Sequence, residues 1–152
     1  MPYTKPLSPA KEFAFALNDV ARLLRTYSDQ RARAVNMTRA QWSVLKKLQT
    51  SQGAKQSELA DALDLAPISL ARLIDKLADL GLVERRDDAS DRRANRLYLT
   101  KKATPLLEKL GALGEDLMAR ALAGVDSKAI AEMNNNMSRI KANLKVELNC
   151  KG

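Results

Sequence analysis

Residues 84–100, ERRDDASDRRANRLYLT, carry the side chains of this chain that are best suited to binding chemistry. Nine of the first thirteen residues are charged, and a short alternation of apolar and polar residues follows. Guanidinium groups bind phosphates, and a nearby carboxylate can hold a guanidinium in one direction. Arg92, Arg93 and Arg96 are therefore candidates for binding a polyanion, and Asp91 is the candidate for orienting Arg93.

The sequence has few residues suited to catalysis or metal binding. Histidine is absent, which removes the commonest general base and the commonest metal ligand. The only cysteine, Cys150, lies in the C-terminal tail and is interpreted as an incidental thiol. No metal-binding spacing, phosphate-binding glycine loop or nucleophile elbow is present. We therefore expect neither an enzyme nor a protein with a metal or cofactor.

Length and charge restrict the class of partner. A chain of 152 residues fits one domain, with or without an oligomerisation element, and its net charge of +8 attracts DNA, RNA or an anionic membrane. A membrane-surface protein would concentrate its lysines on one amphipathic helix, whereas here the basic residues are spread over several elements. No segment has the features of a membrane span or a signal peptide, so we expect a cytoplasmic protein without membrane contact.

Helical periodicity surrounds the charged stretch. Ser8 and Pro9 predict the start of a long helix that runs to about Ala34. Thr38 and Gln41 predict a capping box at the start of a second helix. The hydrophobic staple positions around this box are occupied by Met37 and Trp42.

A helix-turn-helix is predicted next. QSELADALDL forms its first helix, and a short turn leads to a second helix over 67–80, with Pro67 in the first turn and Gly81 as the C-terminal cap. The inner face of the second helix is predicted to comprise Ile68, Ala71, either Leu73 or Ile74, and Leu77.

Two strands, 82–86 and 96–100, are predicted to form a β-hairpin with a long charged tip. Such a hairpin directly after a helix-turn-helix is a wing. A further long helix begins at Thr100 or at Thr104, and a last helix carries an apolar stripe from Ile130 to Leu144.

The predicted fold is therefore mainly α with a small β-hairpin. A winged helix-turn-helix over 35–102 is flanked by helical regions 8–34 and 103–148, which we expect to form a dimer. In the alternative, the apolar faces of these two helical regions pack on each other within one chain and form a monomeric bundle.

With these elements in this order, the chain resembles the MarR family of bacterial transcription regulators, and it looks closest to the SlyA-like branch of that family. The resemblance covers about Phe13 to Leu148. It is carried by SELADALDLAPISLARLIDKLADLGLVER, similar to the family's helix-turn-helix, and by LVERRDDASDRRANRLYLT, similar to its wing with an Asp-x-Arg tip and a strand ending in Leu-Thr.

The resemblance implies a homodimer that binds a pseudo-palindromic double-stranded DNA operator. Helix 67–80 would enter the major groove and the wing, 84–100, would place Arg93 in the minor groove. In the recognition helix the matching positions are Pro67, Ser69, Leu70 and Arg72. The predicted DNA-binding set is completed by Gln56, Ser57, Lys76, Asp91, Arg92 and Arg96.

Many members of the family release DNA when a small aromatic carboxylate binds between their DNA-binding and dimerisation parts. The SlyA-like pattern implies an effector site at Arg22, Arg25 and Trp42. Lys46 stands where that branch often has a histidine, so the chemistry of the site differs there. The alternatives are solvent exposure or salt bridging for these cations, and a core role for Trp42.

Two other functions fit a basic winged helix. A nucleoid-associated protein would bind DNA without operator preference, and a protein-interaction module would not bind DNA. The sequence does not specify the operator, the regulated genes or the effector. It also does not distinguish repression from activation, and it gives no role for Asn134 to Asn136.

Overall fold

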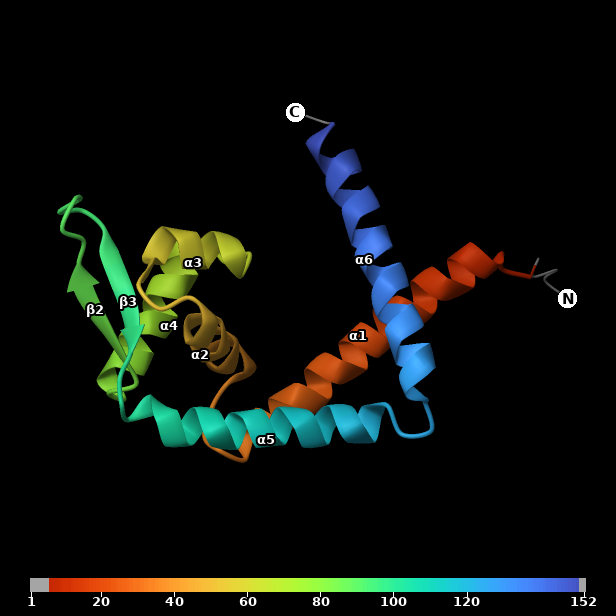
Figure 1. Cartoon of the computed structure of the whole chain (residues 1–152), viewed down its shortest axis with the longest axis horizontal. Coiled ribbons are helices and arrows are strands. Elements are labelled where there is room, and N and C mark those ends of the chain that lie inside the picture. The colour runs from red at the N-terminus through yellow and green to blue at the C-terminus, as the bar shows by residue number, and fades with distance from the viewer. Residues whose placement is uncertain (1–5, 151–152) are drawn as a thin grey trace, which may run out of the picture. The chain divides into compact units, whose positions relative to one another are not determined.

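The computed structural model describes residues 6–150 (Figure 1). The elements are α1 Pro9–Arg33, α2 Arg39–Thr50, β1 Ala54–Lys55, α3 Gln56–Ala62, α4 Pro67–Asp79, β2 Val83–Asp87, β3 Asn95–Leu99, α5 Ala103–Ala121 and α6 Ser127–Asn149. The chain divides into two compact units between Leu117 and Met118, within α5. The predicted mainly α fold with a winged helix-turn-helix is confirmed. None of the helices described is both long and apolar enough to cross a membrane.

Two predicted helix starts have different outcomes. Thr38 and Gln41 form the expected capping box: Gln41 N–H donates to Thr38 Oγ1 at 3.1 Å, and Thr38 N–H donates to Gln41 Oε1 at 2.9 Å. Ser8 occupies the N-cap position of α1, as predicted, but its side chain makes no capping hydrogen bond. Pro9, which fixes the backbone of the first turn, remains as the local start signal.

The helix-turn-helix is closed by two residues with left-handed backbones. Asp64 has φ +52° in the turn between α3 and α4, a conformation that aspartate tolerates better than most residues. Gly81 has φ +72° after α4, and the N–H groups of Gly81 and Leu82 donate to the carbonyls of Ala78 and Leu77. The predicted glycine cap is therefore confirmed, and it turns the chain directly into the wing.

The sheet has three antiparallel strands in the order β1-β3-β2, whereas the sequence predicted only the two wing strands. Strand β1 is two residues long and pairs Ala54 with Leu97 and Lys55 with Arg96. Gly53 begins this pairing with φ +78°, and a Cβ at this position would lie 2.9 Å from Tyr98 Oη. β1 therefore joins the start of α3 to the wing.

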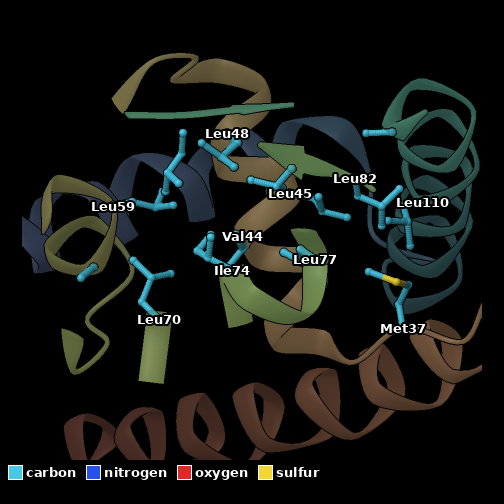
Figure 2. Packing of buried hydrophobic residues seen from close by; sticks show 14 of the residues in the cluster. Met37, Val44, Leu45, Leu48, Leu59, Leu70, Ile74, Leu77, Leu82 and Leu110 are labelled. Carbon is cyan, nitrogen blue, oxygen red and sulfur yellow. The ribbon is translucent and has the colours of Figure 1, made fainter. Parts of the chain in front are cut away.

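A single hydrophobic cluster holds the helix-turn-helix, the sheet and the start of α5 together (Figure 2). Helix α4 contributes Leu70, Ile74 and Leu77, each 0% exposed. Ile68, predicted to face inward, is 63% exposed, so that prediction is wrong. Residues 70, 74 and 77 follow 4,3 spacing, which keeps them on one face of a helix with 3.6 residues per turn.

The start of α5 lies between the two alternatives. Thr100 does not cap the helix, since its hydroxyl donates to the Gly81 carbonyl at 2.5 Å. Thr104 does not precede the helix either, because α5 begins at Ala103.

The long terminal helices leave large apolar side chains exposed. In α1 only Ala32 is buried, while Phe13, Phe15, Leu17, Val20 and Leu23 are exposed. In α6, which is capped by the Asp126 side chain and runs continuously through Asn134–Asn136, no residue is buried. Met133, Leu144, Val146 and Leu148 are exposed there.

Candidate nucleic-acid interface

Helix α4 presents a polar face opposite its core face. Pro67, Ser69, Arg72 and Lys76 are exposed, as expected of residues that contact a ligand. The Arg72 and Lys76 side chains make no hydrogen bond or ion pair with any residue from 6 to 150. Leu70 belongs to the core instead, and its predicted contact with DNA is therefore corrected.

The start of α3 is tied to the wing strand β2 by Arg85. Its Nε donates to Gln56 Oε1 at 3.3 Å, and its Nη2 lies 2.6 Å from Asp75 Oδ1 on α4. Gln56 thus already has a partner within the protein, while Ser57 is exposed beside it. Arg85 was missed at the level of the sequence, because nothing in strand spacing reveals a bond to a helix ten residues earlier.

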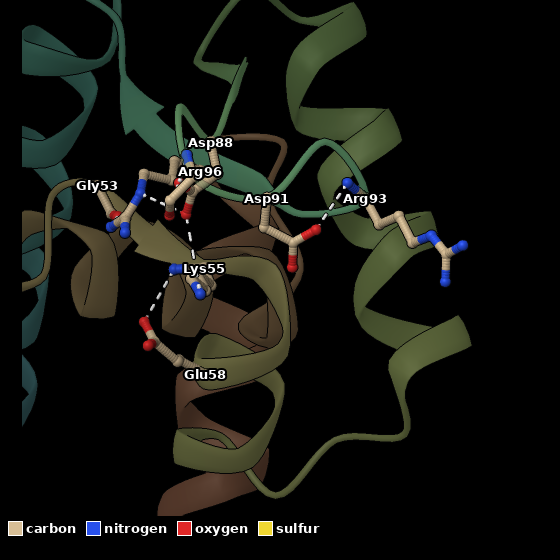
Figure 3. Close-up of polar contacts among 8 residues, drawn as sticks. Gly53, Lys55, Glu58, Asp88, Asp91, Arg93 and Arg96 are labelled. Atoms are coloured by element: carbon tan, nitrogen blue, oxygen red, sulfur yellow. Dashed lines mark hydrogen bonds and ion pairs between the residues drawn. The ribbon is translucent and has the colours of Figure 1, made fainter.

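The base of the wing is held by a carboxylate that is 3% exposed, Asp88. It accepts from Arg96 Nε at 2.9 Å (Figure 3). It also accepts from Ser90 N–H at 2.9 Å and from the Ser90 hydroxyl at 2.8 Å. Lys55 Nζ lies 3.8 Å away, and Arg96 Nη1 donates to the Gly53 carbonyl at 2.8 Å. These contacts link both ends of the hairpin tip to β1.

The same contacts set the charge state of Asp88. Hydrogen bonds from the Ser90 backbone and hydroxyl, followed by the charges of Arg96 and Lys55, lower the pKa of Asp88 to about 2, against the opposing effect of burial. Asp88 is therefore ionised at neutral pH. Neither Asp88 nor Lys55 was singled out from the sequence, because only the folded sheet brings positions 55, 88 and 96 together.

Arg96 is consequently a brace within the wing. The sequence suggested that it meets phosphates, but its guanidinium is shared between the Asp88 carboxylate and the Gly53 carbonyl. Arg86 is similarly engaged: it pairs with Glu84 and lies over the Tyr98 ring, 4.1 Å from its centroid. The arginines of the wing strands hold the wing together.

The tip of the wing has a different character. Asp91 Oδ1 accepts a hydrogen bond from the backbone N–H of Arg93 at 3.0 Å. The Arg93 side chain extends away from this carboxylate (Figure 3). The predicted grip of Asp91 on the guanidinium is therefore wrong, and the carboxylate fixes the backbone that carries Arg93. The side chains of Arg92 and Arg93 are exposed and have no partner in the described part of the chain.

The residues of the predicted effector site lie on α1 and α2. Arg22 is exposed and pairs with Asp19 at 3.4 Å, while Arg25 and Lys46 are exposed. Trp42 is half-buried, and a Cβ on Gly114 of α5 would lie 3.4 Å from its Cζ2. A hollow of about 360 Å³, lined by residues that include Gln52, Thr100 and Glu108, does not include any of these four. Within residues 6–150 no cluster of three or more potential metal-ligating side chains occurs.

Known proteins share the winged-helix fold described above. The model of the MarR family matches residues 37–94, from the start of α2 into the wing tip. A MarR transcriptional regulator from Methanosarcina mazei Go1 is 26% identical, with a TM-score of 0.80 over 90% of this chain and 99% of that one. A mutant MarR from E. coli in complex with operator DNA is 20% identical, with a TM-score of 0.78 over 90% and 99%. The transcriptional regulator SlyA is 22% identical, with a TM-score of 0.78 over 89% and 95%. The family model thus matches the winged-helix part of this chain, and these structures share its fold over about nine-tenths of its length.

Proposed function

We infer that this chain, with its MarR-family winged helix, is a homodimeric transcription regulator that binds operator DNA through α4 and the tip of the wing. One observation carries the proposal. Four exposed cations, Arg72 and Lys76 on α4 and Arg92 and Arg93 at the tip, have no side-chain partner in the described structure, whereas the neighbouring Arg85, Arg86 and Arg96 are bound within the protein.

The cations without a partner are available to bind DNA, whereas the paired arginines stabilise the wing. A cation without an internal partner can replace the counterions of DNA phosphates without first breaking a bond. A braced arginine keeps the wing in one position relative to α3 and α4. The operator complex of the E. coli relative supports the same use of the fold in this chain.

The two elements would read different grooves. Helix α4 is suited to the major groove, where Arg72 can make a bidentate contact with guanine O6 and N7. The tip of the wing would enter the adjacent minor groove with Arg93 while Arg92 meets phosphate. Ser57 and Gln56 at the start of α3 would lie beside the DNA backbone.

Selection of binding sites from random duplexes by the full-length protein tests the function directly. We expect a pseudo-palindromic sequence to emerge, and Arg72→Ala to reduce the preference for it by about 1–3 kcal/mol, with a smaller effect on random DNA. Lys109→Ala, which removes one exposed charge from α5, is the matched control. Equal affinity for all duplexes would indicate a nucleoid-associated protein, and no DNA binding would indicate a protein-interaction module.

We also propose that the helical regions 8–34 and 103–148 form the dimer, and that 35–102 is the DNA-binding region. The support is the exposed apolar surface of α1 and of α6, since soluble monomers rarely leave such stripes uncovered. A dimer would hold two α4 helices at the spacing of two half-sites, about one turn of DNA apart.

Control by a small aromatic carboxylate is the last part of the proposal. Its support is the position of Trp42 on α2, one helical turn from the exposed Lys46, together with the cations Arg22 and Arg25 on α1. Such a ligand would act by favouring a dimer geometry that no longer matches the half-sites. Salicylate titration should quench the fluorescence of Trp42, the only tryptophan, and lower operator affinity. Absence of both effects at millimolar salicylate would contradict control by this class of ligand.

A further inference from the structure

Ile68 is an apolar side chain at the leading end of the recognition helix. It is the second residue of α4, and 63% of its surface is exposed. We propose that Ile68 reads the 5-methyl group of a thymine in the major groove, which makes it a residue that determines operator specificity. This assignment rests on the proposed function and adds a chemical identity to one base of the operator.

The exposure of Ile68 is fixed by the way α4 packs. Leu70, Ile74 and Leu77 are each 0% exposed and define the inward face of the helix, and Leu73 packs beside them. Ile68 lies outside their 4,3 spacing and cannot join them unless α4 rotates about its axis. The three buried side chains fix the rotation of α4, and this rotation keeps Ile68 on the outward side.

Ile68 shares this outward side with the residues proposed to touch bases. Ser69 follows it directly, and Arg72 lies four residues on, where side chains of a helix are neighbours on one face. Arg72 has no partner among the described residues, so both side chains are available to the same ligand surface.

The chemistry of the major groove offers an isoleucine one partner. Base edges there present hydrogen-bond donors and acceptors, except for the 5-methyl group of thymine. Isoleucine forms no hydrogen bond and does not attract phosphate, so it adds little to non-specific binding. Its χ1 angle is already restricted in a helix, which keeps the entropy lost on contact small.

Helix geometry also predicts where the thymine lies. Four residues of α-helix rise about 6 Å, and stacked bases rise about 3.4 Å along one strand. If Arg72 contacts a guanine, the thymine contacted by Ile68 should lie within about two base pairs of it.

A protein partner is the competing occupant of this position. Ile68 lies between Pro67 and Ser69, with Arg72 one helical turn on, and the other exposed large apolar side chain near α4, Leu80, follows the far end of the helix. Single exposed apolar side chains do not form the extended patch that protein partners require. The observations therefore favour DNA.

The test replaces thymidine by deoxyuridine, which removes only the methyl group. The full-length protein is titrated with its selected operator and with duplexes that carry deoxyuridine at one symmetric pair of positions at a time. One pair near the Arg72 guanine should weaken binding by the wild type about fourfold per half-site, the value of one buried methyl group. Ile68→Ala should bind the thymidine and deoxyuridine operators equally.

Leu80→Ala is the matched control, because it removes a similarly exposed apolar side chain and should keep the wild-type response to deoxyuridine. Wild-type binding that no deoxyuridine pair weakens would overturn the assignment. A loss of the same size in wild type and Ile68→Ala would overturn it too, because the methyl group would then act through another residue or through DNA shape. Failure to select any operator would instead reject the regulator function, and the assignment with it.

Discussion

Asp88 Oδ2 accepts a hydrogen bond from Arg96 Nε at 2.9 Å, joining the two ends of the hairpin tip. Lys55 of β1 approaches the same oxygen to 3.8 Å. The direction of the wing relative to the helix-turn-helix is thus set by a small polar cluster, and the charges in the strands have a structural purpose separate from binding.

Replacement of Asp88 by asparagine should destabilise the protein in a pH-dependent manner. The pKa of Asp88 is about 2 in the folded chain, below its ordinary value of 3.8, so the ionised carboxylate favours folding. Its contribution is complete above about pH 4 and is lost as the pH falls toward 2. The melting temperature of Asp88→Asn should therefore lie below that of wild type at pH 7, and the difference should shrink between pH 4 and pH 2.

The neighbouring exposed Asp87 supplies the control. Asp87 directly precedes Asp88, and Asp87→Asn removes the same charge but no side-chain hydrogen bond within the described structure. Its melting temperature should therefore follow wild type at every pH. A constant difference between Asp88→Asn and wild type across this range would contradict the assigned pKa.

Substitution of one wing arginine should affect thermal stability, and substitution of another should affect DNA binding. Arg96→Ala should lower the melting temperature by about 2–4 °C, the shift produced by the loss of a typical hydrogen bond in a chain of this size. Arg92→Ala should leave the melting temperature unchanged and reduce the slope of log affinity against log salt by about 1. Calorimetry and DNA titrations at several salt concentrations measure both effects. A thermal loss in Arg92→Ala would show that the tip arginine is also structural.

The parts of the fold predictable from sequence were those specified by local signals. The Thr38 capping box, Gly81 and the alternation around Leu97 each act within a few residues, and the structure has all three. Strand β1 was not predictable in this way. It is two residues long, and it is a strand only because Leu97 and Arg96 of β3 lie beside it.

The inward face of α4 was ambiguous for a related reason. Ile68 and Leu70 are both apolar and both lie in the first turn, where a helical stripe has too few members to define its direction. The 4,3 spacing of residues 70, 74 and 77 was the better guide. Contacts of Asp88 and Arg85 connect residues that are distant in sequence, and no spacing rule within one element predicts them.

Disruption of the exposed stripe of α1 should dissociate the proposed dimer. Phe15 is 61% exposed in the single chain and would be covered in a dimer. Phe15→Glu should shift the mass measured by light scattering at micromolar concentration from dimer to monomer, because burial of an unpaired carboxylate is costly. Operator affinity should fall with it, as the two recognition helices lose their fixed spacing.

Leu80→Glu introduces the same charge at an exposed apolar residue outside the proposed dimer regions and should remain dimeric. A monomeric mass for the wild type would reject the dimer itself.

Arg93→Ala should weaken operator binding and reduce the preference for A·T pairs beside the half-sites. A narrow A-tract minor groove has an enhanced negative potential, which an inserted arginine senses without hydrogen bonds to particular bases. Titrations with operators that differ only in A·T or G·C flanks measure this preference. If Arg93→Ala retains the wild-type preference, another residue enters the minor groove.

The role of Asp91 can be separated from its charge. Its Oδ1 accepts from the Arg93 backbone N–H, and an asparagine at this position keeps a side-chain oxygen for that bond. Asp91→Asn should therefore bind the operator at least as tightly as wild type, because it preserves the turn and removes a negative charge that repels DNA. Asp91→Ala removes the same charge and also the acceptor, so it should bind more weakly than Asp91→Asn. Equal affinity of the two variants would mean that the turn at the tip forms without this hydrogen bond and that Asp91 acts only through its charge.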